Sequence, residues 1–152
     1  MSPTLTLRNA ALADIETIFS IRTSVNENHL SREEMAEMGI TPQTVADIIA
    51  ESPSIWLADV DGKPAGFAMA IAEEACLFAM FVLPQFEGQG VGKLLLKKAE
   101  AFLLAEHPTI WLETAASSRA AAFYQRHGWR PVGGQDGEDI RFEKSRPAAA
   151  KR

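Results

Sequence analysis

The sequence contains a single cysteine, Cys76, so it cannot form an internal disulfide. No apolar run approaches the ~20 residues of a membrane span, and the N-terminus lacks a signal-peptide pattern. We therefore expect a cytoplasmic protein with no membrane partner. The net charge is −5 and no basic cluster precedes the tail, which argues against a nucleic-acid partner because phosphate binding needs a positive face.

Metal ligands are also scarce. The three histidines are scattered and no Cys/His group has the spacing of a metal site, so we expect no metal. Cys76 lies in an apolar strand pattern, where a lone cysteine acts as a small hydrophobic residue. With 152 residues, 47% hydrophobic and 23% charged, the chain has the size and composition of one globular domain. We place that domain at residues 1–144 and a flexible tail at residues 145–152.

Hydrophobic periodicity predicts a mixed order of strands and helices. Strands are expected at Leu5–Arg8, Ile55–Val60, Ala65–Ala72, Ala75–Leu83, Thr109–Thr114, Trp129–Val132 and Ile140–Glu143. Helices are expected at Ala11–Val25, Leu30–Met38, from Pro42 through Ile49, Val91–Ala105 and Ser117–His127. The stretch Ala75–Leu83 is nearly all apolar, which predicts a strand buried on both faces. This order implies a mixed sheet with helices on both faces.

Short signals mark the ends of these elements. Ser31, with Glu34 three residues later, forms a capping-box pattern, and Thr41 is a second N-cap. Gly39 is placed to end the second helix. The Asp61-Gly62 pair between two apolar strands predicts a tight hairpin.

The most informative stretch runs from the apolar segment Leu77–Leu83 through three alternate glycines, Gly88, Gly90 and Gly92, into the helix that starts at Val91. A strand, a glycine-rich turn and a helix start in that order make an anion site. The N–H groups of the first helical turn have no partner within the helix, and the helix dipole adds partial positive charge. The glycines allow a phosphate to approach the backbone closely.

The spacing of these glycines distinguishes the loop from two better-known phosphate loops. A Walker loop needs a hydroxyl after its lysine, but Leu94 follows Lys93. The interval between Gly90 and Gly92 does not fit the dinucleotide fingerprint G-x-G-x-x-G. Instead, Glu87–Gly92 resembles the pyrophosphate loop of the GNAT superfamily of acetyl-CoA-dependent N-acetyltransferases, written [Q/R]-x-x-G-x-[G/A].

A second motif strengthens the resemblance. The stretch Ser117–Trp129 is similar to the later GNAT signature N-x-x-A-x-x-F-Y-x-x-x-G-F, matching it at Ala120, Phe123, Tyr124 and Gly128. The resemblance spans roughly Leu5 to Glu143. It implies an α/β (α+β) fold with a mixed, mostly antiparallel sheet of about six or seven strands flanked by helices on both faces. It also implies acetyl-CoA as co-substrate and no metal.

The resemblance assigns the coenzyme to the loop, to the strand before it and to the later motif. The implied coenzyme-binding residues are Met80, Phe81, Val82, Glu87, Gly88, Gln89, Gly90, Val91, Gly92, Lys93, Ser117, Ala120 and Phe123. Strand residues act through backbone groups, and the amide of Val82 is the candidate to polarise the thioester carbonyl. Phe123 alternatively packs its own helix. Ser117 stands where the family often has Asn, and either hydrogen-bonds the pantetheine arm or caps its helix.

Glu87 departs from the family pattern because a carboxylate repels a pyrophosphate. Two like charges 4 Å apart repel by about 1 kcal/mol in water. Glu87 either points to solvent or interacts favourably with the positive end of the helix. Gln85 or Gln89 then supplies the hydrogen bonds, and Lys93 either supplies the compensating charge or is a solvated helix residue.

Tyr124, the sole tyrosine, is implied as the general acid that protonates the departing thiolate; the alternative is a half-buried tyrosine without a chemical role. Glu74 and Glu113 are candidate bases for the attacking amine, or exposed carboxylates. The family's acceptor site lies near the first helices. There Arg22, Glu27, Asn28 and His29 form a candidate substrate-binding cluster, or a solvated loop.

We therefore expect an N-acyltransferase, of the class EC 2.3.1.-, that moves an acetyl group from acetyl-CoA to a primary amine by direct attack in a ternary complex. The acceptor is a small amine, or a protein N-terminus or lysine. Homodimers are common in the family, although no residue identifies an interface. The alternatives are a non-catalytic acyl-CoA-binding module on the same fold and an enzyme of phosphorylated metabolites that uses the same loop.

Overall fold

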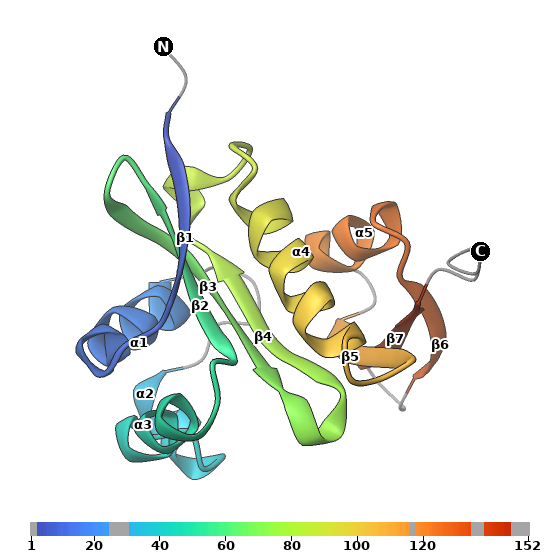
Figure 1. Ribbon diagram of the computed structural model, residues 1–152, viewed down its shortest axis with the longest axis horizontal. Coiled ribbons are helices and arrows are strands. Elements are labelled where there is room, and N and C mark those ends of the chain that lie inside the picture. The colour runs from blue at the N-terminus through green and yellow to red at the C-terminus, as the bar shows by residue number, and fades with distance from the viewer. Residues whose placement is uncertain (1–2, 25–30, 116–117, 135–138, 147–152) are drawn as a thin grey trace. The chain divides into compact units, whose positions relative to one another are not determined.

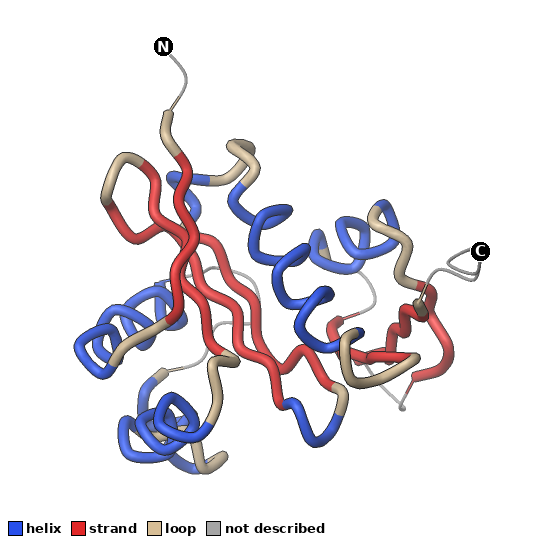
Figure 2. The backbone as a smooth tube through the Cα atoms, viewed as in Figure 1, coloured by secondary structure: helices blue, strands red, loops and turns tan. Residues whose placement is uncertain are grey.

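The computed structural model describes residues 3–24, 31–115, 118–134 and 139–146 (Figures 1 and 2). The strands are β1 Leu5–Asn9, β2 Ile55–Val60, β3 Lys63–Ile71, β4 Cys76–Val82, β5 Thr109–Ala115, β6 Arg130–Gly134 and β7 Asp139–Ser145. The helices are α1 Ile15–Ser24, α2 Arg32–Glu37, α3 Pro42–Glu51, α4 Val91–Leu104 and α5 Arg119–Arg126. Short 3-10 turns lie at Leu12–Asp14, Ala72–Glu74 and Pro84–Phe86.

The strands form a seven-stranded sheet in the order β1-β2-β3-β4-β5-β7-β6. β4 and β5 run parallel and pair at Cys76 and Trp111. The ladders β1/β2, β2/β3, β5/β7 and β6/β7 are antiparallel. The predicted mixed, mostly antiparallel sheet is thereby confirmed.

The chain falls into two compact units. The first contains Met1–Met69 and Ala79–Ala99, and the second contains Ala70–Phe78 and Glu100–Arg152. Strand β4 and helix α4 are therefore each divided between the two units.

In the first unit, the alternation of side chains along β2 and β3 separates two layers. Nine buried residues form the core between the strands and α1, α2 and α3: Ile18, Phe19, Ile21, Met35, Val45, Ile55, Leu57, Phe67 and Met69. The intervening strand positions, such as Trp56 and Ala68, are also buried and point to the other face. The part of α4 that belongs to this unit lies near that face, because a Cβ added to Gly66 would lie 3.2 Å from Leu95 Cδ1.

In the second unit, β5 presents one buried and one open face. Ile110, Leu112 and Thr114 are buried, whereas the alternate residues Trp111 and Glu113 are half-buried and exposed. This alternation is the expected pattern for a strand with one covered face.

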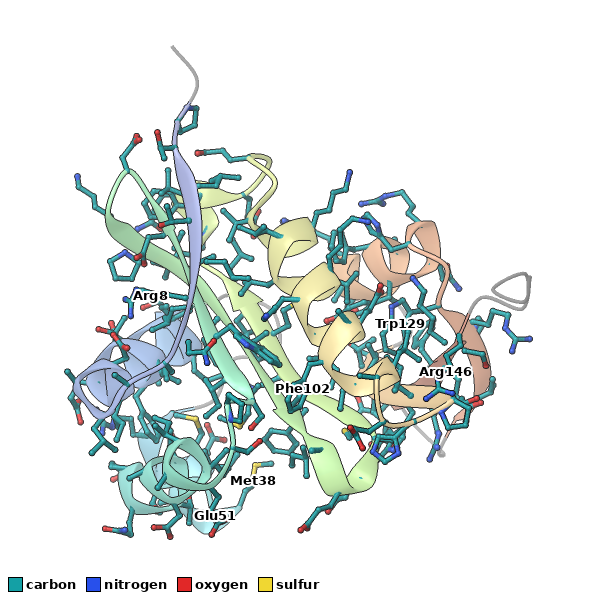
Figure 3. The ribbon with its side chains drawn as sticks, viewed as in Figure 1. Arg8, Met38, Glu51, Phe102, Trp129 and Arg146 are labelled. Carbon is teal, nitrogen blue, oxygen red and sulfur yellow. The ribbon has the colours of Figure 1, made fainter. Side chains whose placement is uncertain are left out.

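The second unit contains a polar network, of which Figure 3 labels one member, Trp129. Lys144 Nζ donates to both carboxylate oxygens of Glu100 at 3.1 Å and to the carbonyl oxygen of His127 at 2.8 Å. The buried Trp129 donates from Nε1 to Glu100 Oε2 at 2.9 Å. The network therefore ties the C-terminal end of α5 to β7 and to α4.

The predicted helix and turn signals are confirmed. Ser31 and Glu34 form a reciprocal capping box, and the Thr41 side chain accepts a hydrogen bond from the Thr44 amide. Asp61 and Gly62 have φ values of 51° and 82°, so both central residues of the hairpin turn are left-handed. Such a turn matches the twist of its two strands.

One expectation needs correction. β4 is not buried on both faces, because Cys76 and Leu77 are buried but Phe78 is 45% exposed and residues 79–82 are half-buried. Apolar composition reports what a side chain prefers, not which faces neighbouring elements cover. At the C-terminus, β7 extends through Ser145, and the Arg146 amide donates to the Pro108 carbonyl at 2.9 Å.

Within the described ranges, no helix combines the length and apolar character needed to cross a membrane.

Candidate functional site

The glycine loop begins where β4 ends. After Val82 the chain passes through the Pro84–Phe86 turn and an extended Glu87, and Gly88 and Gly90 then adopt φ values of 81° and 91°. A side chain would strain the backbone at both positions. Among the described residues there is room for one: no atom lies within 4 Å of a Cβ added to Gly88, and only Leu5 Cδ1 lies near a Cβ added to Gly90, at 3.6 Å. The predicted need for glycine thus has a conformational basis.

Helix α4 starts directly after the loop, at Val91. Its first intrahelical hydrogen bond runs from the Leu94 amide to the Gly90 carbonyl, at 3.0 Å. The amides of Val91, Gly92 and Lys93 therefore belong to the turn that has no partner within the helix. Val91 is buried, while Lys93 and residues 87–90 are exposed. The loop thus presents backbone donors at the positive end of a helix dipole, open to an anion.

The strand before the loop has one edge paired with β3. The Leu83 amide donates to the Ala65 carbonyl at 2.8 Å, so this residue points toward β3. Backbone groups alternate along a strand, so the N–H and C=O groups of Val82 and Met80 point to the opposite edge of β4. The family resemblance assigns the pantetheine arm to the backbone groups of Met80, Phe81 and Val82, but those of Phe81 face β3, with the carbonyl oxygen near Gly66.

Tyr124 lies on α5 in the second unit and is 6% exposed. Its ring centroid is 5.5 Å from that of Phe123 and 5.9 Å from that of Trp129. Burial raises the pKa of the phenol well above its usual range near 10. The hydroxyl is therefore protonated at neutral pH, which is the state that a proton donor needs.

The helix that carries Tyr124 is capped by a different serine from the one predicted. The N-cap is Ser118, whose hydroxyl accepts from the Ala121 amide at 3.1 Å, and Ser117 lies outside the described residues. The prediction that Ser117 caps this helix was therefore wrong by one position. The motif contains two adjacent serines, and spacing alone does not decide which one has the extended backbone of a cap.

Two further residues of this motif, Phe123 and Ala120, are half-buried. Phe123 packs along its own helix, with its centroid 4.5 Å from that of His127 and 6.0 Å from Arg126 Cζ. Ala120 lies one turn earlier. Both remain candidate coenzyme contacts.

The two candidate bases, Glu74 and Glu113, are exposed and belong to the second unit. Both carboxylates act on Cys76. Burial is the main cause that raises the pKa of the Cys76 thiol, to about 12, and the charges of Glu74 and then Glu113 add to that rise. Arg141 opposes this rise and lies over the Trp111 ring at 4.4 Å. The structure thus brings both carboxylates to the region around Cys76.

Of the predicted acceptor cluster, Arg22 is described, whereas Glu27, Asn28 and His29 lie outside the described residues. Arg22 is half-buried on α1, and its Cζ lies 4.1 Å from the centroid of the Phe81 ring of β4. Sequence reasoning gave no sign of this contact, because the two residues are far apart in the chain and neither belongs to a motif that links them.

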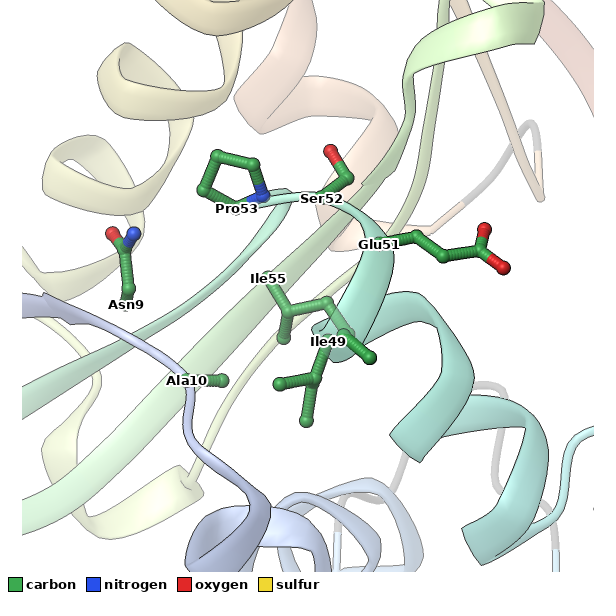
Figure 4. Close-up of a pocket in the computed structure, with 8 residues that line it drawn as sticks. Asn9, Ala10, Ile49, Glu51, Ser52, Pro53 and Ile55 are labelled. Atoms are coloured by element: carbon green, nitrogen blue, oxygen red, sulfur yellow. The ribbon is translucent and has the colours of Figure 1, made fainter.

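A cavity of about 300 Å³ lies elsewhere in the first unit (Figure 4). It is lined by Asn9, Ala10, Ile49, Ala50, Glu51, Ser52, Pro53 and Ile55. These residues include none of the predicted site residues. In the part of the chain that the structure describes, no three His, Cys, Asp or Glu side chains are grouped to hold a metal.

Comparison with known proteins identifies related sequences and folds. The model of the Acetyltransferase (GNAT) domain matches residues 51–131. The peptidyl-lysine N-acetyltransferase YjaB of Salmonella typhimurium is 29% identical over 140 residues, which cover 90% of each chain. The [ribosomal protein bS18]-alanine N-acetyltransferase of Haemophilus influenzae is 41% identical over 71 residues, which cover 44% of this chain and 48% of that one.

The fold also matches solved structures. The crystal structure of the PaiA N-acetyltransferase from Thermoplasma acidophilum in complex with coenzyme A superposes with a TM-score of 0.76. The match covers 94% of this chain and 99% of the other at 20% sequence identity. At that identity the likeness establishes the fold.

Proposed function

This chain belongs to the GNAT acetyltransferase family, and from that membership we propose that it acetylates a lysine side chain of a protein. The activity itself, transfer of an acetyl group from acetyl-CoA to an amine, is that of the family, and the chain is an N-acetyltransferase. The lysine acceptor is supported by the Salmonella relative, whose match spans most of both chains. An N-terminal alanine is the second candidate, supported by the shorter match to the Haemophilus relative.

One observation supports the assignment of the coenzyme site: Gly88 and Gly90, both in the left-handed region, lead directly into the N-terminus of α4. In this proposal the amides of residues 88–92 bind the pyrophosphate, and Lys93 adds positive charge. Glu87 is exposed, so its carboxylate has room to stay in water and away from the phosphates. The residues present therefore fit a diphosphate.

The pantetheine arm pairs with the edge of β4 that faces away from β3. Val82 and Met80 offer their N–H and C=O groups along that edge, and the Val82 amide donates to the thioester carbonyl. A hydrogen bond to this oxygen stabilises the negative charge that develops on it during attack. Acetyl-CoA, when bound, supplies the acetyl group as a thioester whose sulfur leaves as a thiolate.

Two proton movements accompany the transfer. A lysine amine with a pKa near ~10.4 has to lose a proton before it attacks, and Glu74 and Glu113 are the candidate acceptors, acting through water. Tyr124 donates a proton to the departing sulfur. Direct attack, without a covalent enzyme intermediate, is supported by the state of Cys76, because a buried thiol with a pKa near 12 is a poor nucleophile.

The test is a steady-state assay of coenzyme A release with acetyl-CoA and a panel of lysine peptides, N-terminal alanine peptides and small amines. Lysine peptides are expected to give the highest kcat/KM. A higher value for alanine peptides would select the second candidate, and no release with any amine would reject both. A homodimer is a separate prediction, to be tested by analytical ultracentrifugation.

A further inference from the structure

Arg22 is a charged side chain with no ion-pair partner among the described residues. Its Cζ lies 4.1 Å above the Phe81 ring, and Phe81 in turn packs against Phe67 with ring centroids 6.0 Å apart. Nη1 is shielded from solvent and has no hydrogen-bond acceptor among the described residues. Burial lowers the pKa of Arg22, but an arginine stays charged at neutral pH. The fold therefore keeps a cation beside β4 with a donor unsatisfied.

The other two arginines that the structure describes in the first unit are paired. Arg32 also lies over a phenylalanine, Phe19, at 4.6 Å, but it donates to Glu16 at 2.7 Å. Arg8 binds Asp14 and Asp59, each at 2.9 Å. A partly buried cation without such a partner is costly, and an anion that arrives with a ligand offsets that cost.

We propose that Arg22 is a specificity-determining residue that binds a carboxylate of the acceptor. This inference rests on the proposed function, since it makes α1 and β4 part of the acceptor site. The Phe81 ring covers one face of the guanidinium, so the N–H groups at its edge are the ones that can bind an oxygen. Phe81 lies in the strand proposed to hold the thioester, between Met80 and Val82.

The chemistry selects a class of acceptor. A lysine ammonium alone is repelled by Arg22, whereas an acceptor that also carries a carboxylate is attracted through it. The carboxylate has two sources: an acidic side chain next to the lysine of a peptide, or the α-carboxylate of a free amino acid. Both offer the same planar pair of oxygens to the guanidinium.

Two matched acceptor pairs test the proposal on the wild-type enzyme. The first pair is a lysine peptide with Glu, or with Gln, beside the lysine; the second is free lysine and lysinamide. At least a tenfold higher kcat/KM is expected for the acidic member of one pair, mostly through KM. The pair that shows the preference identifies the source of the carboxylate.

Variants assign the preference to Arg22. Arg22→Met is expected to reduce the ratio of kcat/KM within the preferred pair to below twofold, and Arg22→Lys to keep part of it. Arg32→Met is the matched control, because it removes the other arginine stacked on a phenylalanine and is expected to keep the full ratio. If Arg22→Met fails to fold, Arg22→Lys and inhibition of the wild type by glutarate, compared with glutaramide, decide the question.

Equal kcat/KM within both pairs, or a preference that Arg22→Met retains, would overturn the assignment. Neither result touches the proposed function, because coenzyme A would still be released. If the proposed function fails instead, no acceptor of either pair releases coenzyme A.

Discussion

The carbonyl oxygen of Phe81 lies 2.7 Å from the position that a Cβ on Gly66 would occupy. The Val82 Cα and Leu95 Cδ1 are also near that position, at 3.3 and 3.2 Å. Gly66 thus sets how closely β3 approaches the part of β4 that carries the proposed thioester site. The closest contact is with backbone, which cannot move as a side chain can.

Replacing Gly66 with alanine is therefore expected to destabilise the protein by about 1–3 kcal/mol, through a steric clash in a packed core. Urea denaturation measures the loss. Adding Leu95→Ala to the variant is not expected to recover stability, because the first obstacle is the Phe81 carbonyl. An unchanged denaturation midpoint for Gly66→Ala would contradict the role assigned to this glycine.

Gly90→Arg is expected to abolish acetyl-CoA binding, because its side chain fills the proposed phosphate site and distorts a left-handed residue. The matched control is Gly39→Arg. Gly39 also has a positive φ, 87°, and no described atom lies within 4 Å of a Cβ added there, but it ends α2 and lies outside the loop. Both variants carry a strain of about 1–2 kcal/mol. Calorimetry should detect coenzyme binding only in the control, and wild-type affinity in Gly90→Arg would reject the loop.

Tyr124→Phe is expected to lower kcat by about one to two orders of magnitude, as for the loss of a general acid, with little change in coenzyme affinity. Because burial raises the pKa of Tyr124, the phenol stays protonated through pH 10. The wild type should therefore show no loss of kcat/KM between pH 7 and pH 10 from this group, while deprotonation of the lysine acceptor raises the rate. An unchanged kcat in Tyr124→Phe would show that Tyr124 is not the general acid.

Glu100→Gln is expected to destabilise the second unit by roughly 1–2 kcal/mol, because Lys144 loses a charged partner in a partly buried place. The control is Glu143→Gln, which removes the more exposed ion pair with Arg141 at 3.2 Å and is expected to cost less than about 1 kcal/mol. Thermal denaturation compares the two. A larger loss in the control would contradict the importance of the Glu100 network.

The raised pKa of the Cys76 thiol predicts that the free energy of unfolding depends on pH. Its thiol titrates near pH 9 when unfolded and near pH 12 when folded, so the native state holds one more proton between these values. Stability contributed by this group is full below pH 9 and falls as pH rises toward 12. Cys76→Ala should flatten the decline in melting temperature between pH 9 and pH 11. Equal declines in both proteins would contradict the assignment.

Much of the fold could be predicted from sequence because its signals are local. Ser31 with Glu34, Thr41 and the Asp61-Gly62 pair each act within a few residues, and the structure contains each device as predicted. The glycine loop is local in the same sense, since a strand end, two left-handed glycines and a helix start suffice to present its amides.

What the sequence could not show depends on contacts between distant residues. Arg22 and Phe81 are far apart in the chain, as are Lys144 and Glu100, and no periodicity reports such pairs. The open face of β4 was missed for a related reason, because an apolar strand has the same composition whether or not another element covers it. The choice between Ser117 and Ser118 as cap turned on a single backbone conformation.

The alternation that points Val82 and Met80 away from β3 has an evolutionary consequence. If main-chain groups of β4 bind the coenzyme, any side chain that keeps the strand extended preserves that binding. Selection then acts on register instead of on residue identity, and mutations can accumulate in this strand without loss of catalysis. Distant members of such a lineage would be more readily recognised by structural superposition than by sequence alignment.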